Sequence, residues 1–276
     1  MSNELRLSRL YDGGSFTSTM IAVSNSFYYG PAPGLATTAE VRSVLRASID
    51  GGADAVMITP GALRANLDLF RGRDRPGIVL SAGYTNAWRA TDRLGHAGRA
   101  TDQRLFVSVE EAVRLGVDAF HVYAFLGYSD SSLEAAEVER VGQVCEAARS
   151  WGLPVLCEPL VRGDLVDPAE ANRVEYVALA ARVLSEVGVD MVKVEYTGDP
   201  ESFAQVVASS HVPVVMMGGA PVPTFEGFLD MVGTAISSGA RGLAVGRNVY
   251  SQPDAATAVR SVVDRVRSSA VRADKF

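Results

Sequence analysis

Lysine is almost missing from this sequence of 276 residues. Only Lys193 and Lys275 carry an ammonium group, and the other 24 of the 26 basic residues are Arg. A GC-rich genome favours arginine codons and accounts for this bias at most positions. Arg stays charged in proteins and cannot form an imine. A lysine that is kept inside an apolar stretch, as Lys193 is, therefore indicates chemistry that Arg cannot perform.

Cysteine, histidine and long apolar runs are also scarce. Cys145 and Cys157 form no Cys-x-x-Cys pair and fit reduced thiols better than a disulfide framework. His96, His121 and His211 are far apart, so we expect no metal site and no cofactor. The sequence shows no signal-peptide core, and no apolar stretch reaches the roughly 18 residues that span a bilayer. These absences predict a cytoplasmic protein that does not contact a membrane.

Charge of one sign does not accumulate either. The formal net charge is −6 and the basic residues are scattered, which argues against nucleic acid as a partner. Apolar residues make up 47 % of the chain and charged residues 21 %, enough for a large core. Barrels of the (β/α)8 type often run to about 250 residues. We expect a single domain over residues 1–276.

Short apolar runs alternate with longer segments of helical spacing, a pattern typical of α/β proteins with a parallel sheet. Eight strands are expected at residues 20–24, 55–58, 78–82, 119–125, 155–160, 191–196, 212–217 and 243–245. Eight strands with crossovers favour a closed (β/α)8 TIM barrel. An open doubly wound sheet is the alternative, although no Gly-x-Gly-x-x-Gly follows the first strand. A long polar loop at residues 83–102 is placed to cover the active face.

Helices are expected over residues 38–50, 107–115, 131–151, 167–187, 224–238 and 254–271. The second opens with a capping box formed by Ser108 and Glu111. Three helix-to-strand junctions share the phrase Gly-x-Asp, which ends at Asp54, Asp118 and Asp190. Gly239-Ala240-Arg241 is a looser copy. This repetition supports a series of βα units.

Lys193 lies in the sixth predicted strand. Alternation along a strand puts Lys193 on the same face as Met191 and Glu195, and puts Val192 and Val194 on the other. The valine face suits the surrounding helices, so Lys193 points into the barrel near the end where barrel active sites lie. Burial favours the neutral amine, which is the nucleophile that forms imines with ketones. The structural alternative is a plain buried ion pair between Lys193 and Glu195.

The last two predicted strands end in glycine-containing turns, at Gly218-Gly219 and at Gly246-Arg247. In (β/α)8 barrels the loops after strands seven and eight commonly bind phosphate through backbone N–H groups. Arg247 can add charge-assisted hydrogen bonds. We therefore predict a phosphate site formed by Gly218, Gly219, Gly246 and Arg247, with two plain turns as the alternative.

Three stretches carry a family resemblance. They are Lys-Val-Glu-Tyr-Thr-Gly-Asp-Pro-Glu-Ser-Phe at 193–203, Pro-Val-Val-Met-Met-Gly-Gly at 213–219 and Ala-Val-Gly-Arg-Asn-Val-Tyr at 244–250. Together they resemble the archaeal-type class I fructose-bisphosphate aldolases, also called the DhnA or DeoC/FbaB/LacD type. The resemblance implies a (β/α)8 barrel, a Schiff base on Lys193, a small phosphorylated carbonyl substrate and a homo-oligomer. It also implies phosphate held at the two glycine turns.

The sequence departs from the family at two acid–base positions. The family's Met-Asp-His-Gly after the first strand is replaced by Val23-Ser24-Asn25-Ser26. Its Tyr-Pro-Arg-Gly on the fifth strand is replaced by Leu160-Val161-Arg162-Gly163, which lacks the tyrosine. We expect Ser24, Asn25 and Arg162 to contact the substrate, and we expect other side chains to move the protons.

Strand direction indicates which side chains those are. Glu158 on the fifth strand and Tyr123 on the fourth are the favoured acid–base groups. Glu195 lies beside Lys193. His121 shares the face of Tyr123, and two tyrosines follow the first strand, at positions 28 and 29.

These residues predict a class I aldolase, a carbon–carbon lyase. Phe27-Tyr28-Tyr29 makes the mouth more aromatic than a sugar-bisphosphate site requires. Our hypothesis is a donor such as dihydroxyacetone phosphate and an acceptor other than glyceraldehyde 3-phosphate, as in condensations that build aromatic precursors. The alternatives are a transaldolase-like or thiolase-like enzyme with the same imine, and a non-catalytic barrel that binds a phosphorylated ligand.

Overall fold

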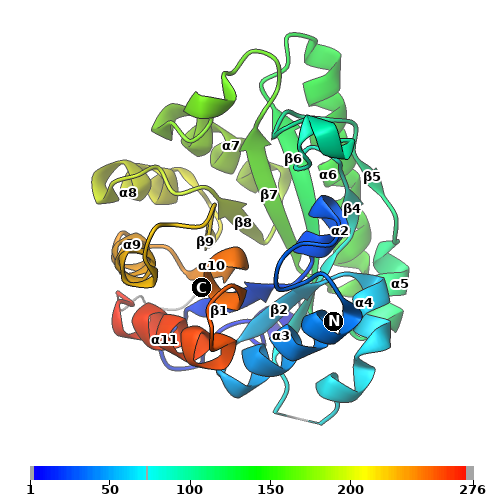
Figure 1. Cartoon of the computed structure of the whole chain (residues 1–276). Helices are drawn as coiled ribbons and strands as arrows, with labels where there is room; N and C mark the ends of the chain where they lie inside the picture. The colour runs from blue at the N-terminus through cyan, green and yellow to red at the C-terminus, as the bar shows by residue number, and fades with distance from the viewer. Residues whose placement is uncertain (1–2, 73, 272–276) are drawn as a thin grey trace.

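The computed structural model describes residues 3–72 and 74–271, and these form a closed barrel of parallel strands with helices outside it (Figure 1). The order around the barrel is β1-β10-β9-β8-β7-β6-β3-β2. Its strands are β1 Ser18–Ala22, β2 Ala55–Ile58, β3 Gly77–Ser81, β6 Ala119–Leu126, β7 Val155–Val161, β8 Met191–Val194, β9 Val214–Met217 and β10 Gly242–Val245. The predicted (β/α)8 barrel is confirmed, and the open sheet is wrong.

Two predicted strands extend two residues too far at their carboxyl ends. The first strand ends at Ala22, because the chain turns at Ser24 into the short helix α2, Asn25–Tyr29. The sixth ends at Val194 and not at residue 196. Its ladder with β9 stops at Val194, so Glu195 has no strand partner although the side-chain alternation continues through it.

Helices precede, connect and follow the strands of the barrel. They are α1 Glu4–Leu7, α2, α3 Thr38–Asp50, α4 Pro60–Ala65, α5 Val109–Arg114, α6 Ser131–Trp151, α7 Val174–Val187, α8 Pro200–Ser209, α9 Phe225–Ser237, α10 Arg247–Tyr250 and α11 Ala255–Ser268. The Ser108 hydroxyl accepts the Glu111 N–H at the start of α5, as the capping box predicts. Among residues 3–72 and 74–271, no helix is both long enough and apolar enough to cross a membrane.

The single helix predicted over residues 167–187 is wrong. The Asp167 side chain caps a 3-10 turn at Pro168–Glu170, and α7 begins only at Val174. Helices α4 and α8 were not predicted. Each begins with a proline at its first position after a capping Thr59 or Asp199, a start signal that outweighs weak periodicity in a short helix.

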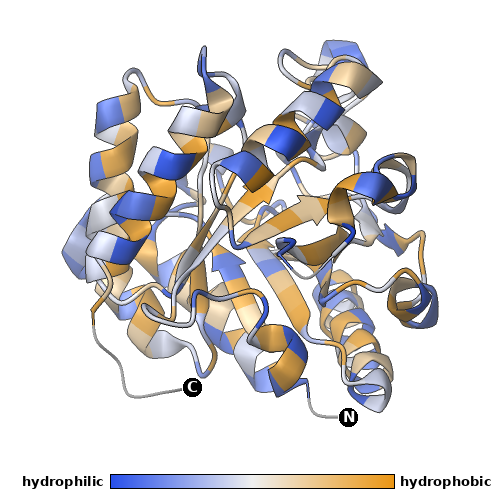
Figure 2. Ribbon diagram, turned by 90° about the horizontal axis from the view of Figure 1, so that it is seen from below, coloured by the Kyte–Doolittle hydropathy of each residue, from blue (hydrophilic) through white to orange (hydrophobic). Residues whose placement is uncertain are grey.

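Apolar side chains lie on both faces of the barrel strands, and Figure 2 shows many hydrophobic residues, in orange, along the strands and the surrounding helices. Val192 and Val194 pack in the outer layer between strands and helices. Met191 lies in the inner layer, which fills the barrel together with Leu10 and Tyr11 from the N-terminal segment. The predicted parity of β8 is therefore correct, and the barrel is filled at its amino end and open for chemistry at its carboxyl end.

The three Gly-x-Asp junctions have one structural role at the amino ends of the strands. Each aspartate precedes its own strand and accepts a backbone N–H from the neighbouring one. Asp54 accepts from Thr19 at 2.8 Å, Asp118 from Ile78 at 3.0 Å and Asp190 from Val155 at 2.8 Å. These carboxylates join β1 to β2, β3 to β6 and β7 to β8.

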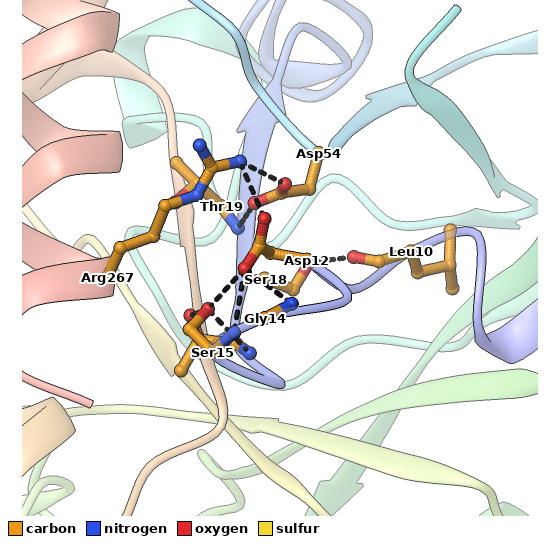
Figure 3. Close-up of polar contacts among 9 residues, drawn as sticks. Leu10, Asp12, Gly14, Ser15, Ser18, Thr19, Asp54 and Arg267 are labelled. Atoms are coloured by element: carbon orange, nitrogen blue, oxygen red, sulfur yellow. Dashed lines mark hydrogen bonds and ion pairs between the residues drawn. The ribbon is translucent and has the colours of Figure 1, made fainter. Parts of the chain in front are cut away.

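Arginines neutralise two of these carboxylates. Figure 3 shows Arg267 reaching between Asp54 and Asp12, at 2.9 and 3.4 Å. Arg75 lies 2.8 Å from Asp118, whose side chain is fully buried. A buried carboxylate that has both an N–H donor and a cation stabilises the junction, whereas loss of the carboxylate leaves both partners unsatisfied.

We predict that Asp118→Ala destabilises the fold by about 2–4 kcal/mol, because Ile78 loses an acceptor and Arg75 loses its counter-charge. Asp118→Asn should lose less, since the amide oxygen still accepts from Ile78. Urea unfolding measures the difference. Asp50→Ala, at an exposed carboxylate at the end of α3, is the control and should change little. Equal losses for the Ala and Asn variants would contradict this role of the hydrogen bond.

Candidate active site

A cavity of about 240 Å³ opens at the carboxyl ends of the strands. Polar and charged side chains line it from β7, β8 and the loops after β9 and β10. Aromatic side chains line it from α2, β6 and the loop after β3. The lining residues are Ala22, Asn25, Tyr28, Tyr29, Trp88, Tyr123, Glu158, Arg162, Lys193, Glu195, Met217, Gly218, Gly219, Ala220, Ala244, Gly246 and Arg247.

Lys193 lies at the floor of this cavity and is 7 % exposed. Its Nζ donates to Glu158 Oε2 at 2.6 Å. The same oxygen is 3.1 Å from His121 Nε2. Strands β8, β7 and β6 thus bring a lysine, a carboxylate and an imidazole into one buried line.

The charges of this line follow from burial and pairing. Burial alone would raise the pKa of Glu158, but the Lys193 ammonium and the hydrogen bond with His121 outweigh it and hold the pKa below its ordinary value. Burial lowers the pKa of His121, although Glu158 opposes this. Glu158 is therefore ionised at neutral pH, and His121 is a neutral imidazole that donates from Nε2. His121 Nδ1 has no hydrogen-bond partner in the part of the chain that the structure describes.

Glu195 has a different partner from the one that the sequence suggested. Its Oε1 accepts from Arg162 Nη2 at 2.5 Å, and burial raises the pKa of Glu195 in spite of that guanidinium. The alternative of a Lys193–Glu195 ion pair is wrong, because the carboxylate at Lys193 is Glu158. Arg162 also donates to the Pro168 carbonyl at 3.2 Å. Glu195 and Pro168 thus fix Arg162 at the cavity wall.

The loops after β9 and β10 form the other side of the cavity. Arg247 donates to the Gly219 carbonyl at 3.2 Å and lies over the Tyr29 ring at 5.3 Å. Gly219 has φ +66°, which favours glycine, and a Cβ at Gly246 would lie 2.6 Å from the Asn25 amide. The two turns therefore form a close-packed surface with a guanidinium at its rim.

The long loop after β3 covers the opposite side of the mouth. The two-residue strands β4, Gly83–Tyr84, and β5, Arg104–Leu105, pair and close its base. The loop is fixed to α2, because Arg89 donates to the Tyr28 carbonyl at 2.7 Å. Trp88 then lies 6.0 Å from the Tyr123 ring and faces the cavity.

Comparison with known proteins identifies the family of the chain. The model of the DeoC/LacD family aldolases matches residues 19–252. The chain belongs to this aldolase family. The fructose-bisphosphate aldolase class 1 of Thermoproteus tenax is 32 % identical to it over 252 residues, which covers 90 % of this chain and 89 % of the relative. The predicted family and the predicted class I aldolase are confirmed.

Two further relatives widen the comparison. The 2-amino-4,5-dihydroxy-6-oxo-7-(phosphonooxy)heptanoate synthase of Streptomyces griseus is 33 % identical over 177 residues, covering 64 % of this chain and 63 % of the synthase. A solved archaeal fructose-1,6-bisphosphate aldolase, with its catalytic Lys covalently bound to the carbinolamine intermediate of the substrate, has a TM-score of 0.80. It is 27 % identical to this aldolase and covers 96 % of this chain and 100 % of its own.

In this chain, nearly all of the predicted site residues line one cavity. Lys193, Glu158, Tyr123, Glu195, Asn25, Arg162, Gly218, Gly219, Gly246 and Arg247 line it. Ser24 does not: it is buried at the start of α2, because the chain turns there and leaves β1 two residues earlier. The Gly218 N–H is bonded to the Ala244 carbonyl, so it is not available to a phosphate.

Sequence reasoning missed two contributors. Trp88 lies in a loop without periodicity, and its position follows only from the loop's tethers. Asn248 was part of the Gly246-Arg247-Asn248 phrase but was given no role. Its amide donates to the Gly218 and Ala220 carbonyls at 2.8 and 3.0 Å and accepts from the Val222 N–H at 2.9 Å. Asn248 therefore shapes the loop after β9.

We predict that His121 positions Glu158 in the aldolase. His121→Ala should slow imine formation with a three-carbon ketone phosphate by about 10–100-fold, since the carboxylate loses its second anchor. The acidic limb of the pH profile should move to higher pH, because loss of a donor raises the pKa of Glu158. His121→Gln, which can still donate an N–H, should restore much of the rate and reverse the shift. Equal losses with an unmoved acidic limb would show a merely structural histidine.

Proposed function

We propose that the chain is a class I aldolase that forms an imine between Lys193 and a phosphorylated ketone, with dihydroxyacetone phosphate as the donor. The single observation that carries this proposal is the buried Lys193–Glu158 pair, at 2.6 Å, on the floor of a cavity whose rim holds Arg247. A lysine that served only as structure would have no need of an open cavity above it.

The paired carboxylate gives Lys193 a route to its nucleophilic form. Glu158 accepts a proton from the ammonium, and the free amine attacks the ketone carbon. Loss of water from the resulting carbinolamine gives the imine, and Glu158 returns the proton that this step requires. The protonated imine then draws electrons from the adjacent carbon–carbon bond, which can break or form.

Phosphate binding is assigned to the loops after β9 and β10. Arg247 lies at their rim, and Gly219, Ala220 and Gly246 bring the backbone to the cavity surface. A guanidinium with backbone N–H groups is a common phosphate site in (β/α)8 barrels. The phosphate would lie beside β8, so the carbonyl of a three-carbon donor reaches Lys193.

Tyr123 is the proposed replacement for the family's missing tyrosine. In the register of β6 and β7, Tyr123 lies opposite Glu158, and Leu160 lies opposite Phe125. The Tyr123 phenol is therefore on the strand next to the position of the missing tyrosine, and it is two residues nearer the amino end of the barrel. Burial, followed by the nearby Glu158 charge, raises the pKa of Tyr123, which keeps its hydroxyl protonated as a proton donor.

The acceptor is proposed to be an aldehyde other than glyceraldehyde 3-phosphate, joined in the biosynthetic direction. The aromatic side of the cavity supports this, since a second phosphate gains nothing from rings. The relationship to the Streptomyces griseus synthase also supports a condensing role for this family. The predicted cytoplasmic location and self-association stay predictions from the sequence.

Borohydride trapping tests the imine. With dihydroxyacetone phosphate, the intact mass should increase by one reduced adduct, and the adduct should map to Lys193. Lys193→Met should abolish it. Lys275→Arg is the matched control, because Lys275, outside the described residues, is the other lysine of the sequence. A transaldolase-like or thiolase-like enzyme would also be trapped. No adduct with any three-carbon ketone phosphate would favour the non-catalytic phosphate-binding barrel.

We predict that Arg247→Ala raises the KM for dihydroxyacetone phosphate by about 10–100-fold, because a charge-assisted hydrogen bond contributes about 1.5–3 kcal/mol. The KM for unphosphorylated dihydroxyacetone should hardly change. Steady-state rates of aldol product formation at varied ketone concentration measure both values. A parallel rise for the two ketones would remove Arg247 from the phosphate site.

A further inference from the structure

The strand order places the aromatic side of the cavity across from the phosphate side. From β9 and β10, the barrel runs through β8 and β7 to β6 in one direction, and through β1 and β2 to β3 in the other. Tyr123 on β6 and Trp88 in the loop after β3 therefore lie on the opposite side of the mouth from Gly219 and Arg247. Lys193 and Glu158 lie between the two sides.

This arrangement fixes where an acceptor must bind if the donor binds as proposed above. In dihydroxyacetone phosphate, the carbon that forms the new bond is on the other side of the carbonyl from the phosphate. With the phosphate at the loops after β9 and β10 and the carbonyl at Lys193, the reacting carbon points toward β6 and β3. The acceptor aldehyde then lies between that carbon and the aromatic side.

The aromatic side is a packed wall. The Tyr28 and Tyr123 rings meet edge to face, with centroids 5.3 Å apart and an angle of 89° between their planes. Trp88 packs against Tyr123, and Phe125 and Leu160 lie behind them. Tyr28 lines the cavity although it is only 1 % exposed, and its hydroxyl is already engaged as a donor to the Gly83 carbonyl at 3.1 Å.

This wall offers no cation to an acceptor. Over residues 3–72 and 74–271, the basic side chains that line the cavity are Arg162, Lys193 and Arg247. Arg162 is held by Glu195 and the Pro168 carbonyl. Arg89 of the covering loop is directed elsewhere, with its Nε on the Tyr28 carbonyl and its guanidinium over the Tyr84 ring. A phosphate or carboxylate against this wall would lose its hydration without a partner.

We infer that the acceptor is an uncharged aldehyde with an aromatic or apolar substituent, which lies against Tyr28, Trp88 and Tyr123. This inference rests on the proposed function. The donor carbon next to the imine loses a proton to Glu158 and adds to the aldehyde carbon, which forms the new carbon–carbon bond. The aldehyde oxygen gains a proton from Tyr123, and Glu158 restores that proton. Water then hydrolyses the imine and releases the product from Lys193.

The test compares an uncharged aromatic acceptor with two charged acceptors. With dihydroxyacetone phosphate as donor, kcat/KM for product formation is measured with benzaldehyde, 4-carboxybenzaldehyde and glyceraldehyde 3-phosphate. Benzaldehyde should exceed each charged acceptor by about 10-fold or more, because a carboxylate or phosphate against the wall loses its hydration without a cation to pair with. Equal or better use of a charged acceptor, or no product from benzaldehyde, overturns the inference.

Two variants locate the effect. Trp88→Ala should lower kcat/KM for benzaldehyde by about 10-fold. Trp88→Arg should shift the preference toward 4-carboxybenzaldehyde, because it places a cation on the wall. Trp151→Ala is the control, since Trp151 is an exposed tryptophan at the end of α6. Unchanged acceptor ratios in both Trp88 variants would contradict the assigned wall.

Borohydride trapping with the donor alone separates this inference from the proposed function. Trapping on Lys193 with preference for charged acceptors leaves the aldolase proposal standing and removes the apolar acceptor. Absence of trapping removes both.

Discussion

The buried pair of Lys193 and Glu158 is the interaction on which the rest of the site depends. Each charge would be costly alone in the barrel interior, and the two are tolerated because they are 2.6 Å apart. In the proposed mechanism, a protonated imine on Lys193 keeps the positive charge at the same nitrogen. Glu158 would then face a cation before and after that step, and the surrounding dipoles would need little rearrangement. His121, fixed on the neighbouring strand, holds the same carboxylate oxygen from the other side.

Around this pair the cavity divides into two halves of different chemistry. The loops after β9 and β10 bring glycine backbone and Arg247, and the β6 and β3 side brings aromatic rings. A barrel can carry such a division because each strand end supplies one position of the rim independently. Leu160, where the family resemblance implies a tyrosine, makes the local surface there apolar. The phenol of Tyr123 lies on the adjacent strand, two residues nearer the amino end.

The sequence was sufficient for the barrel and for the direction of Lys193, because both depend on local periodicity. The alternation of Val192 and Val194 with Lys193 is enough to predict which side chains of β8 point into the barrel. The partner of Lys193 could not be predicted in this way, because it depends on a contact between two strands and not on local periodicity. Glu195 is near in sequence, but Glu158 is near in space, and only the register of β7 against β8 decides between them. The position of Trp88 depends on the hydrogen bonds of its loop, and the start of α7 depends on a preceding turn. Neither produces a periodic pattern in the sequence.

The aspartates at the amino ends of the strands have a consequence for the architecture as a whole. They recur at every second seam: β1 with β2, β3 with β6, and β7 with β8. At the corresponding seam of β9 with β10 the position is Arg241, whose backbone N–H bonds to the Val214 carbonyl while its side chain cannot accept.

An aspartate carboxylate thus joins three of the four strand pairs at alternate seams of the barrel, and the fourth pair has a backbone hydrogen bond at that place. The β7–β8 pair carries Asp190 at its amino end and the Glu158–Lys193 pair at the other. Leu156 and Cys157 pair with Met191 and Val192 between these two anchors. Lys193 and Glu158 therefore lie on one strand pair, whose register is held by the Asp190 hydrogen bond at its amino end.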